Sequence, residues 1–167
     1  MVTAATVLLW MFADPLADAR GKTAVLLFLS AECPISNRYA PELRRLYGRF
    51  AGPSVVFYAV YPNPGENEST VRAHVQEFGI PGRWLTDSDH ALVRKAGVRV
   101  TPEAAVFAPD GRMVYRGRID DRYAELGKMR PRPRHRDLEE ALQAVVAGRA
   151  APRSQAPAVG CAVQDAR

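Results

Sequence analysis

Residues 23–37 read TAVLLFLSAECPISN, and this stretch decides the fold of the chain. The apolar run 23–30 predicts a buried strand, and Cys33-Pro34 is the point at which a helix begins. A thiol at a helix N-terminus lies near unsatisfied backbone N–H groups and the positive end of the helix dipole, which favours the nucleophilic thiolate. The alternative is that Cys33 is a small buried apolar residue. An exposed strand end followed by Cys-Pro favours the reactive thiol.

The composition describes one globular domain of ordinary size. The chain has 167 residues, of which 47% are apolar and 25% charged, with a formal net charge of +5. This basic balance suits an acidic partner, a membrane surface or simple solubility. Without a basic amphipathic helix or an aromatic-lined groove we expect no nucleic-acid binding. Two cysteines, Cys33 and Cys161, are too few for a disulfide-rich scaffold and too far apart for a Cys-x-x-Cys zinc site.

Strand and helix patterns alternate along the chain, which predicts an α/β fold. We expect a central mixed β-sheet flanked by helices, with a closing β-hairpin and a C-terminal helix. The polar stretch 117–136 contains two prolines and is predicted to be a loop. Asp137 is the predicted N-cap of the last helix, with Glu140 completing a capping box. The predicted elements after the first strand are a helix from residue 34, a strand over 54–61, a helix over 69–78, an extended piece over 83–85, a helix over 89–96, a hairpin over 103–116 and a helix over 137–148.

The two ends of the chain differ from its centre. Residues 1–20 form an apolar segment that is either signal-like or a first strand, and its apolar run is too short to span a bilayer as a helix. Residues 21–148 make up the predicted domain. Residues 149–167 form a tail that lacks periodicity and carries Cys161. Because the N-terminal apolar run is too short to span a bilayer, we expect no stable membrane span.

The order of these elements resembles the thioredoxin fold. Cys33 follows an apolar strand, and Thr101-Pro102 precedes the strand that begins at Glu103. The resemblance implies that the peptide bond before Pro102 is cis and that this proline faces the reactive sulfur. It also implies that the backbone of Thr101 is free to pair with an extended substrate. A cis X-Pro bond costs only about 0.5–1 kcal/mol, so the sequence permits it.

A narrower resemblance comes from residues 28–43, FLSAECPISNRYAPEL, which are similar to the redoxin branch related to alkyl hydroperoxide reductase and thiol-specific antioxidant proteins. The segments around 110–111, 115–121 and 159–161 are also similar to redoxin domains fused to c-type cytochromes. This resemblance implies an exported or periplasmic location and a cytochrome-type redox partner, while a cytoplasmic location stays open. The sequence has no Cys-x-x-Cys-His haem attachment site, so this chain carries no cytochrome part.

The motif at Cys33 departs from that of a dithiol oxidoreductase. Ser36 replaces the second thiol, so Cys33 cannot form a local disulfide, and this hydroxyl is either a donor to the thiolate or a helix cap. Ser30 fills the place of the Thr or Ser of a peroxidase site, whereas Leu26 replaces the expected proline and weakens that assignment. Cys161 is either the resolving thiol, if the tail folds back, or an idle one.

An arginine is also needed to activate the thiolate in a peroxidase site, and Arg38 and Arg99 are the two candidates. The three histidines, His74, His90 and His135, lack metal-like spacing, so we expect no metal and no cofactor.

Two reactions fit a reactive Cys33. Attack on a peroxide would give a sulfenic acid, and attack on a protein disulfide would give a mixed disulfide. Each requires a thiol reductant that the sequence does not identify. The sequence thus predicts a thiol-dependent oxidoreductase, either a peroxiredoxin-like antioxidant or a thiol-disulfide exchanger. The alternative class is a non-catalytic thioredoxin-like module that binds a protein or carries a metal.

Overall fold

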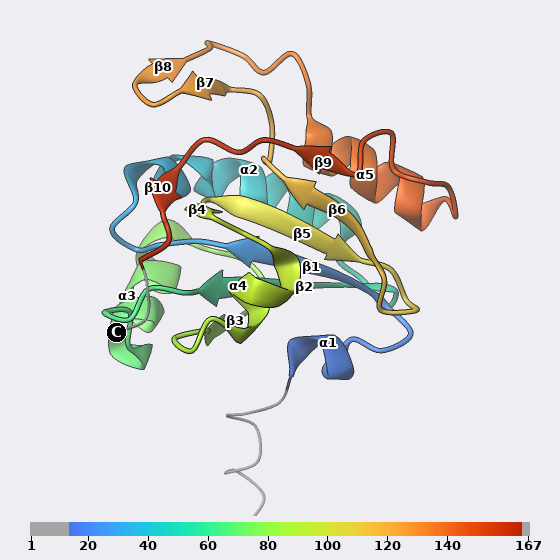
Figure 1. Cartoon of the computed structure of the whole chain (residues 1–167), viewed down its shortest axis with the longest axis horizontal. Helices are drawn as coiled ribbons and strands as arrows, with labels where there is room; N and C mark the ends of the chain where they lie inside the picture. The colour runs from blue at the N-terminus through green and yellow to red at the C-terminus, as the bar shows by residue number, and fades with distance from the viewer. Residues whose placement is uncertain (1–13, 165–167) are drawn as a thin grey trace, which may run out of the picture.

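A computed structural model of the chain describes residues 14–164. Its centre is a six-stranded mixed sheet with the strand order β3-β2-β1-β5-β6-β9 (Figure 1). The three strands β1, β2 and β3 are parallel, β5 runs antiparallel to both β1 and β6, and β9 is parallel to β6. The strands of this sheet are β1 (Thr23–Phe28), β2 (Val55–Tyr61), β3 (Arg83–Thr86), β5 (Glu103–Phe107), β6 (Met113–Gly117) and β9 (Gln155–Ala156).

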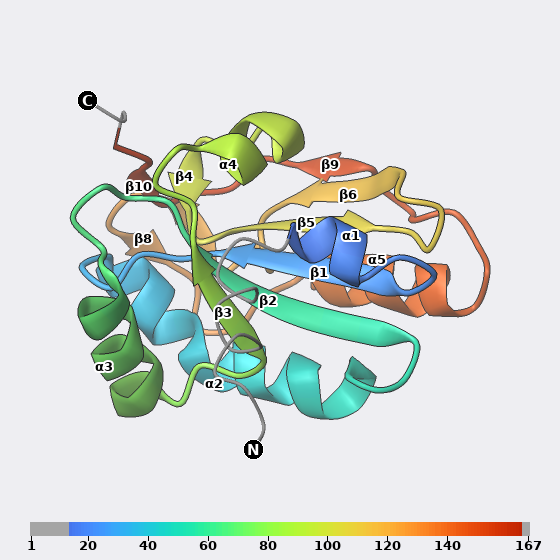
Figure 2. The same ribbon diagram turned by 90° about the horizontal axis from the view of Figure 1, so that it is seen from below.

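Helices cover both faces of the sheet because its central strand is apolar on both sides. All six residues of β1 are buried, and alternate side chains point to opposite faces. Val25 and Leu27 join a core with α2, α3 and α5, whereas Leu26 and Phe28 join a second core with α4. Figure 2 shows α4 on one side of the strands and α2 on the other. The helices are α1 (Pro15–Asp18), α2 (Pro34–Phe50), α3 (Glu68–Phe78), α4 (Ala91–Ala96) and α5 (Asp137–Val146).

This architecture confirms the predicted α/β, thioredoxin-like fold, including the closing hairpin and the C-terminal helix. Of the N-terminal segment, residues 1–13 lie outside the described residues, and α1 follows them. Among helices in residues 14–164, none is long and apolar enough to cross a membrane.

Two local predictions were wrong. The stretch predicted to be a loop contains a small hairpin of β7 (Tyr123–Glu125) and β8 (Lys128–Met129), whose mostly exposed strands are too short to leave a pattern. Helix α5 has Arg136 as its N-cap residue and no side-chain cap, because the carboxylate of Asp137 is instead bound by Arg118 and Arg153.

The tail is ordered by two short pairings. After α5 the chain returns along the sheet through β9 and then reaches β10 (Cys161–Ala162), which pairs antiparallel with β4 (Val100–Thr101). Figure 1 shows the red C-terminal segment passing from β9 to β10 beside β4. This path brings the end of the described chain back to the beginning of α2.

Candidate active site

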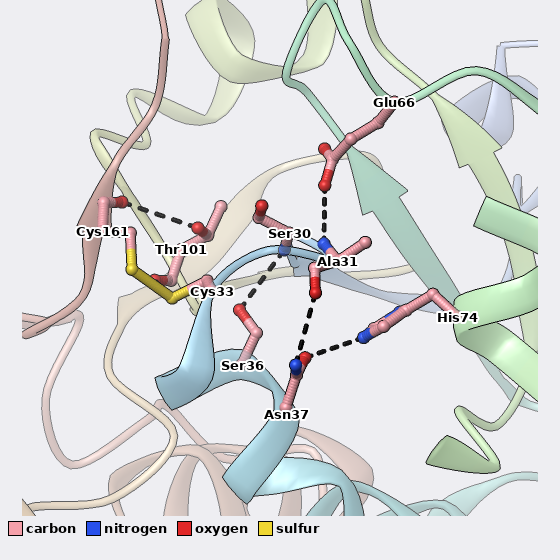
Figure 3. Close-up of a disulfide and its surroundings, with 9 residues drawn as sticks. All are labelled: Ser30, Ala31, Cys33, Ser36, Asn37, Glu66, His74, Thr101 and Cys161. Atoms are coloured by element: carbon pink, nitrogen blue, oxygen red, sulfur yellow. Dashed lines mark hydrogen bonds between the residues drawn. A yellow bond between two sulfur atoms is a disulfide. The ribbon is translucent and has the colours of Figure 1, made fainter. Parts of the chain in front are cut away.

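Cys33 and Cys161 form a disulfide at the N-terminus of α2 (Figure 3). The two residues are 128 positions apart in the sequence, and their Cα atoms are 6.1 Å apart. Cys33 is the N-cap residue of α2, with Pro34 in the first turn. Its exposed fraction is only 1%, which corrects the expectation of an exposed thiol, because the tail that carries Cys161 covers it. Cys161 itself is half-buried.

Thr101 and Pro102 lie against this disulfide. The peptide bond between them is cis, as expected. The carbonyl oxygen of Thr101 is 3.1 Å from the Sγ atom of Cys33. The side-chain hydroxyl of Thr101 donates a hydrogen bond of 3.5 Å to the carbonyl of Cys161. The backbone of Thr101 was expected to be free for a substrate, and this expectation was wrong. Cys161 is paired with it, so the chain's own tail occupies that edge.

Ser30 and Ser36 shape the turn that presents Cys33. The backbone N–H of Ser30 donates to the hydroxyl oxygen of Ser36 at 3.3 Å, and the N–H of Cys33 donates to the carbonyl of Ser30 at 3.2 Å. Both serines are buried. The carbonyl of Cys33 accepts from the N–H of Asn37 at 3.1 Å, which is the first hydrogen bond of the helix. Ser36 therefore closes the turn before the helix instead of offering a second redox group.

A chain of hydrogen bonds connects this turn to the core, and no local sequence pattern predicted it. The side-chain amide of Asn37 donates to the carbonyl of Ala31 at 3.3 Å. Its Oδ1 lies 2.8 Å from Nε2 of His74, and Nδ1 of His74 lies 2.8 Å from the hydroxyl of Tyr61. Burial lowers the pKa of His74, which favours the neutral ring. A neutral ring then accepts from Tyr61 and donates to Asn37.

Glu66 is a second group that the sequence analysis missed. Its carboxylate accepts a 2.6 Å hydrogen bond from the N–H of Ala31 and a 3.2 Å bond from the N–H of Asn63. Burial raises the pKa of Glu66, and the hydrogen bonds from Ala31, Ser30 and Asn63 oppose that rise only in part. Asn63 in turn accepts from the N–H of Gln164 at 3.0 Å. The loop between β2 and α3 thus contacts the chain near both cysteines.

The two remaining predicted site residues are Arg38 and Arg99, and no side-chain hydrogen bond joins either of them to the disulfide in the described residues. The side chains of Arg38 and Arg99 are exposed. Arg99 contributes its backbone, because its carbonyl accepts from the N–H of Val163 at 3.0 Å. Within residues 14–164, no group of three or more His, Cys, Asp or Glu side chains could hold a metal ion.

Comparison with known proteins adds to this geometry. The pattern of the AhpC/TSA family matches residues 15–116, more than half of the chain. A thiol-disulfide oxidoreductase ResA from Halalkalibacterium halodurans is 28% identical over 99 residues, which cover 59% of this chain. Those residues cover 55% of the ResA chain, so this protein matches about half the length of that curated relative.

Solved structures extend the likeness over nearly the whole chain. A conserved protein from Geobacillus kaustophilus is 26% identical, with a TM-score of 0.75, and the match covers 90% of this chain and 81% of that one. A hypothetical protein from Sinorhizobium meliloti is 27% identical, also with a TM-score of 0.75, over 89% and 82% of the two chains. A secreted disulfide oxidoreductase from Mycobacterium tuberculosis is 25% identical, with a TM-score of 0.50, over 58% and 69%.

The fold and the disulfide beside a cis-proline place this chain among the thioredoxin-like redoxins. Within that class it belongs to the AhpC/TSA family.

Proposed function

We propose that this protein is a thiol-disulfide oxidoreductase that cycles between the Cys33–Cys161 disulfide and two thiols. The observation that carries the proposal is the position of the disulfide, with Cys33 at the N-terminus of α2 and its sulfur against the cis Thr101-Pro102 bond. Helix N-terminal N–H groups stabilise a thiolate, which is the attacking form in thiol-disulfide exchange. The likeness to ResA supports the same reaction class.

In the reductive direction, the Cys33 thiolate attacks one sulfur of a protein disulfide. The substrate S–S bond breaks, a mixed disulfide forms at Cys33, and the first substrate thiolate leaves and takes up a proton. The Cys161 thiolate then attacks the Cys33 sulfur and displaces the second substrate thiolate. The substrate gains two electrons and two protons, and the protein is left with the Cys33–Cys161 disulfide. A dithiol reductant then restores the two thiols. The cytochrome-type redox partner that the family resemblance implies stays a prediction.

Peroxide reduction is the second candidate, and membership of the AhpC/TSA family favours it. Here the Cys33 thiolate would attack a peroxide oxygen, the O–O bond would break, and the leaving oxygen would depart as water or an alcohol after protonation. The resulting sulfenic acid on Cys33 would condense with the Cys161 thiol, releasing water and forming the same disulfide. The arginines proposed to activate such a site, Arg38 and Arg99, have exposed side chains, so disulfide exchange is the better supported reaction.

Turnover with purified wild type, Cys33→Ser and Cys161→Ser tests the proposal. With dithiothreitol as reductant, insulin is the disulfide substrate in one assay and hydrogen peroxide the oxidant in another. We expect wild type to accelerate insulin reduction and Cys33→Ser to abolish that acceleration. Pre-reduced Cys161→Ser, mixed with insulin after dithiothreitol has been removed, should accumulate a mixed disulfide at Cys33 that mass spectrometry detects. No acceleration of either reaction by wild type would contradict the proposal and favour a non-catalytic binding module.

A further inference from the structure

The tail reaches the candidate active site through backbone contacts as well as through the disulfide. Cys161 pairs with Thr101, and Ala162 pairs with Val100. The next residue, Val163, donates its N–H to the carbonyl of Arg99 at 3.0 Å. These contacts hold an extended segment along β4, beside the sulfur of Cys33 (Figure 3).

Gly160 passes closer to this edge than any side chain would allow. A Cβ atom built on Gly160 would lie 2.2 Å from the carbonyl oxygen of Thr101, 2.7 Å from its carbonyl carbon and 3.2 Å from the nitrogen of Pro102. All three are backbone atoms, so a flexible side chain cannot move aside to relieve the overlap. Gly160 is not required here by a left-handed backbone, since its φ is outside that region. Close approach is the reason for glycine at this position.

The oxygen that Gly160 approaches is the same one that contacts the sulfur of Cys33. The carbonyl oxygen of Thr101 lies 3.1 Å from Sγ of Cys33. The residue after Gly160 is Cys161, so a displacement of the tail by even one atom's width at Gly160 carries the second sulfur away from the first. The fit of Gly160 over Thr101 thus fixes the distance at which the two cysteines meet.

We infer that Gly160 is a positioning residue that lets the tail come close enough for Cys161 to reach Cys33. A cysteine can pair with β4 at this position only when the residue before it has no side chain. This inference rests on the proposed redox cycle, because it assigns a role in the second, resolving step. The first step is the attack by Cys33 and does not need the tail in place. A side chain at position 160 therefore slows resolution without slowing attack.

The test compares full-length Gly160→Ala with wild type and with Gly48→Ala. Gly48 is a matched control because a Cβ there meets nothing within 4 Å and its φ is not left-handed. The reduced proteins are mixed with an aromatic disulfide in stopped flow, which separates release of the first thiolate from release of the second. We expect Gly160→Ala to release the first at the wild-type rate or faster and the second roughly tenfold more slowly or worse, as overpacking predicts.

The same variant should have a weaker Cys33–Cys161 bond at equilibrium. A tenfold decrease in the equilibrium constant for forming this disulfide corresponds to a rise of about 30 mV in its reduction potential, which is measured against glutathione buffers. Gly48→Ala should match wild type in both experiments. A Gly160→Ala chain that folds, as judged by circular dichroism, and resolves at the wild-type rate would overturn the inference.

A second measurement decides the matter if Gly160→Ala does not fold. In Cys161→Ser, which keeps Gly160 but cannot form the disulfide, the amide of Val163 should stay protected from hydrogen exchange because the backbone fit still holds the tail. Exchange at the rate of an unstructured amide would show that the disulfide alone holds it, which contradicts the inference. Neither measurement uses insulin or peroxide, so the inference and the proposed function can fail separately.

Discussion

Nε2 of His74 in α3 lies 2.8 Å from Oδ1 of Asn37 in α2, and this hydrogen bond joins α3 to the turn that presents Cys33. The ring is buried, and its other nitrogen lies 2.8 Å from the hydroxyl of Tyr61. Hydrogen bonds through His74 and Asn37 therefore connect Tyr61 in β2 to the carbonyl of Ala31, two residues before Cys33.

Replacement of His74 by leucine should destabilise the protein. Leucine leaves Oδ1 of Asn37 and the hydroxyl of Tyr61 without their ring partner, and a buried polar group left unpaired costs about 1–3 kcal/mol. We expect the free energy of unfolding, measured in urea at pH 7, to fall by about 2 kcal/mol. His135→Leu is the control because the His135 side chain is exposed, and it should change the free energy little. Equal losses in the two variants would contradict the structural role of His74.

His74 should also make stability depend on pH. Its folded pKa is below the ordinary value of 6.5 because burial disfavours the charged ring. The unfolded chain then binds more protons than the folded one below about pH 6.5, so the stabilisation is complete above that pH and is lost as the pH falls through the folded pKa. Urea unfolding of wild type and His74→Gln between pH 5 and pH 8 measures this effect, and the glutamine variant should lose that part of the pH dependence.

Glu66 should make stability depend on pH in the opposite direction from His74. Burial raises its folded pKa above 4.5, so the folded chain binds more protons than the unfolded one, and stability decreases as the pH rises through the folded pKa. Its two hydrogen bonds still matter, since Glu66→Ala leaves the N–H groups of Ala31 and Asn63 without their acceptor. We expect Glu66→Ala to lower the free energy of unfolding by about 2 kcal/mol at pH 7.

Glu68→Ala is the matched control for Glu66→Ala. Glu68 lies two residues further along and pairs with Arg72, but both side chains are more than half exposed, and exposed ion pairs contribute little. A loss in Glu68→Ala as large as that in Glu66→Ala would mean that the loop and the first turn of α3 tolerate neither change and that the buried hydrogen bonds are not the cause.

The disulfide should contribute strongly to stability because it closes a long loop. Cys33 and Cys161 are 128 residues apart, and a native disulfide of this kind contributes about 2–5 kcal/mol, mainly by restricting the unfolded chain. Urea unfolding with and without a reductant measures the difference. Cys161→Ser should unfold like the reduced wild type and should not respond to the reductant, and any response of this variant would count against the assignment.

Local patterns predicted the parts of the site that are close in sequence. The strand before Cys33 and the helix after it follow from residues 23–37, and the cis bond at Pro102 came from a family resemblance. The contacts of Glu66 and His74 were not predictable, because they join residues 35 and 37 positions apart whose types have other common roles. The return of the tail to Cys33 stayed one of two alternatives for a different reason, since β10 has two residues and too little length to show periodicity.

Asp137 shows how a common local pattern can be overridden by a distant partner. The sequence predicted an N-cap, yet its side chain is 1% exposed and bound by Arg118 at 2.8 Å and Arg153 at 3.2 Å. These contacts join α5 both to the segment after β6 and to the beginning of the tail, which continues into β9 and then to Cys161. Removal of this carboxylate should therefore affect the tail as well as the helix.

We expect Asp137→Ala to lower the free energy of unfolding by about 2–3 kcal/mol. This loss is smaller than the loss expected from breaking a fully buried ion pair, because both arginines are partly exposed. Arg153→Ala, which leaves the pair with Arg118 intact, should lose less. If Asp137 acted only as a helix cap, Asp137→Ser would retain most of the stability, because serine is a good N-cap residue. Since a serine hydroxyl cannot bind two guanidinium groups with a full charge, we expect Asp137→Ser to unfold nearly as easily as Asp137→Ala.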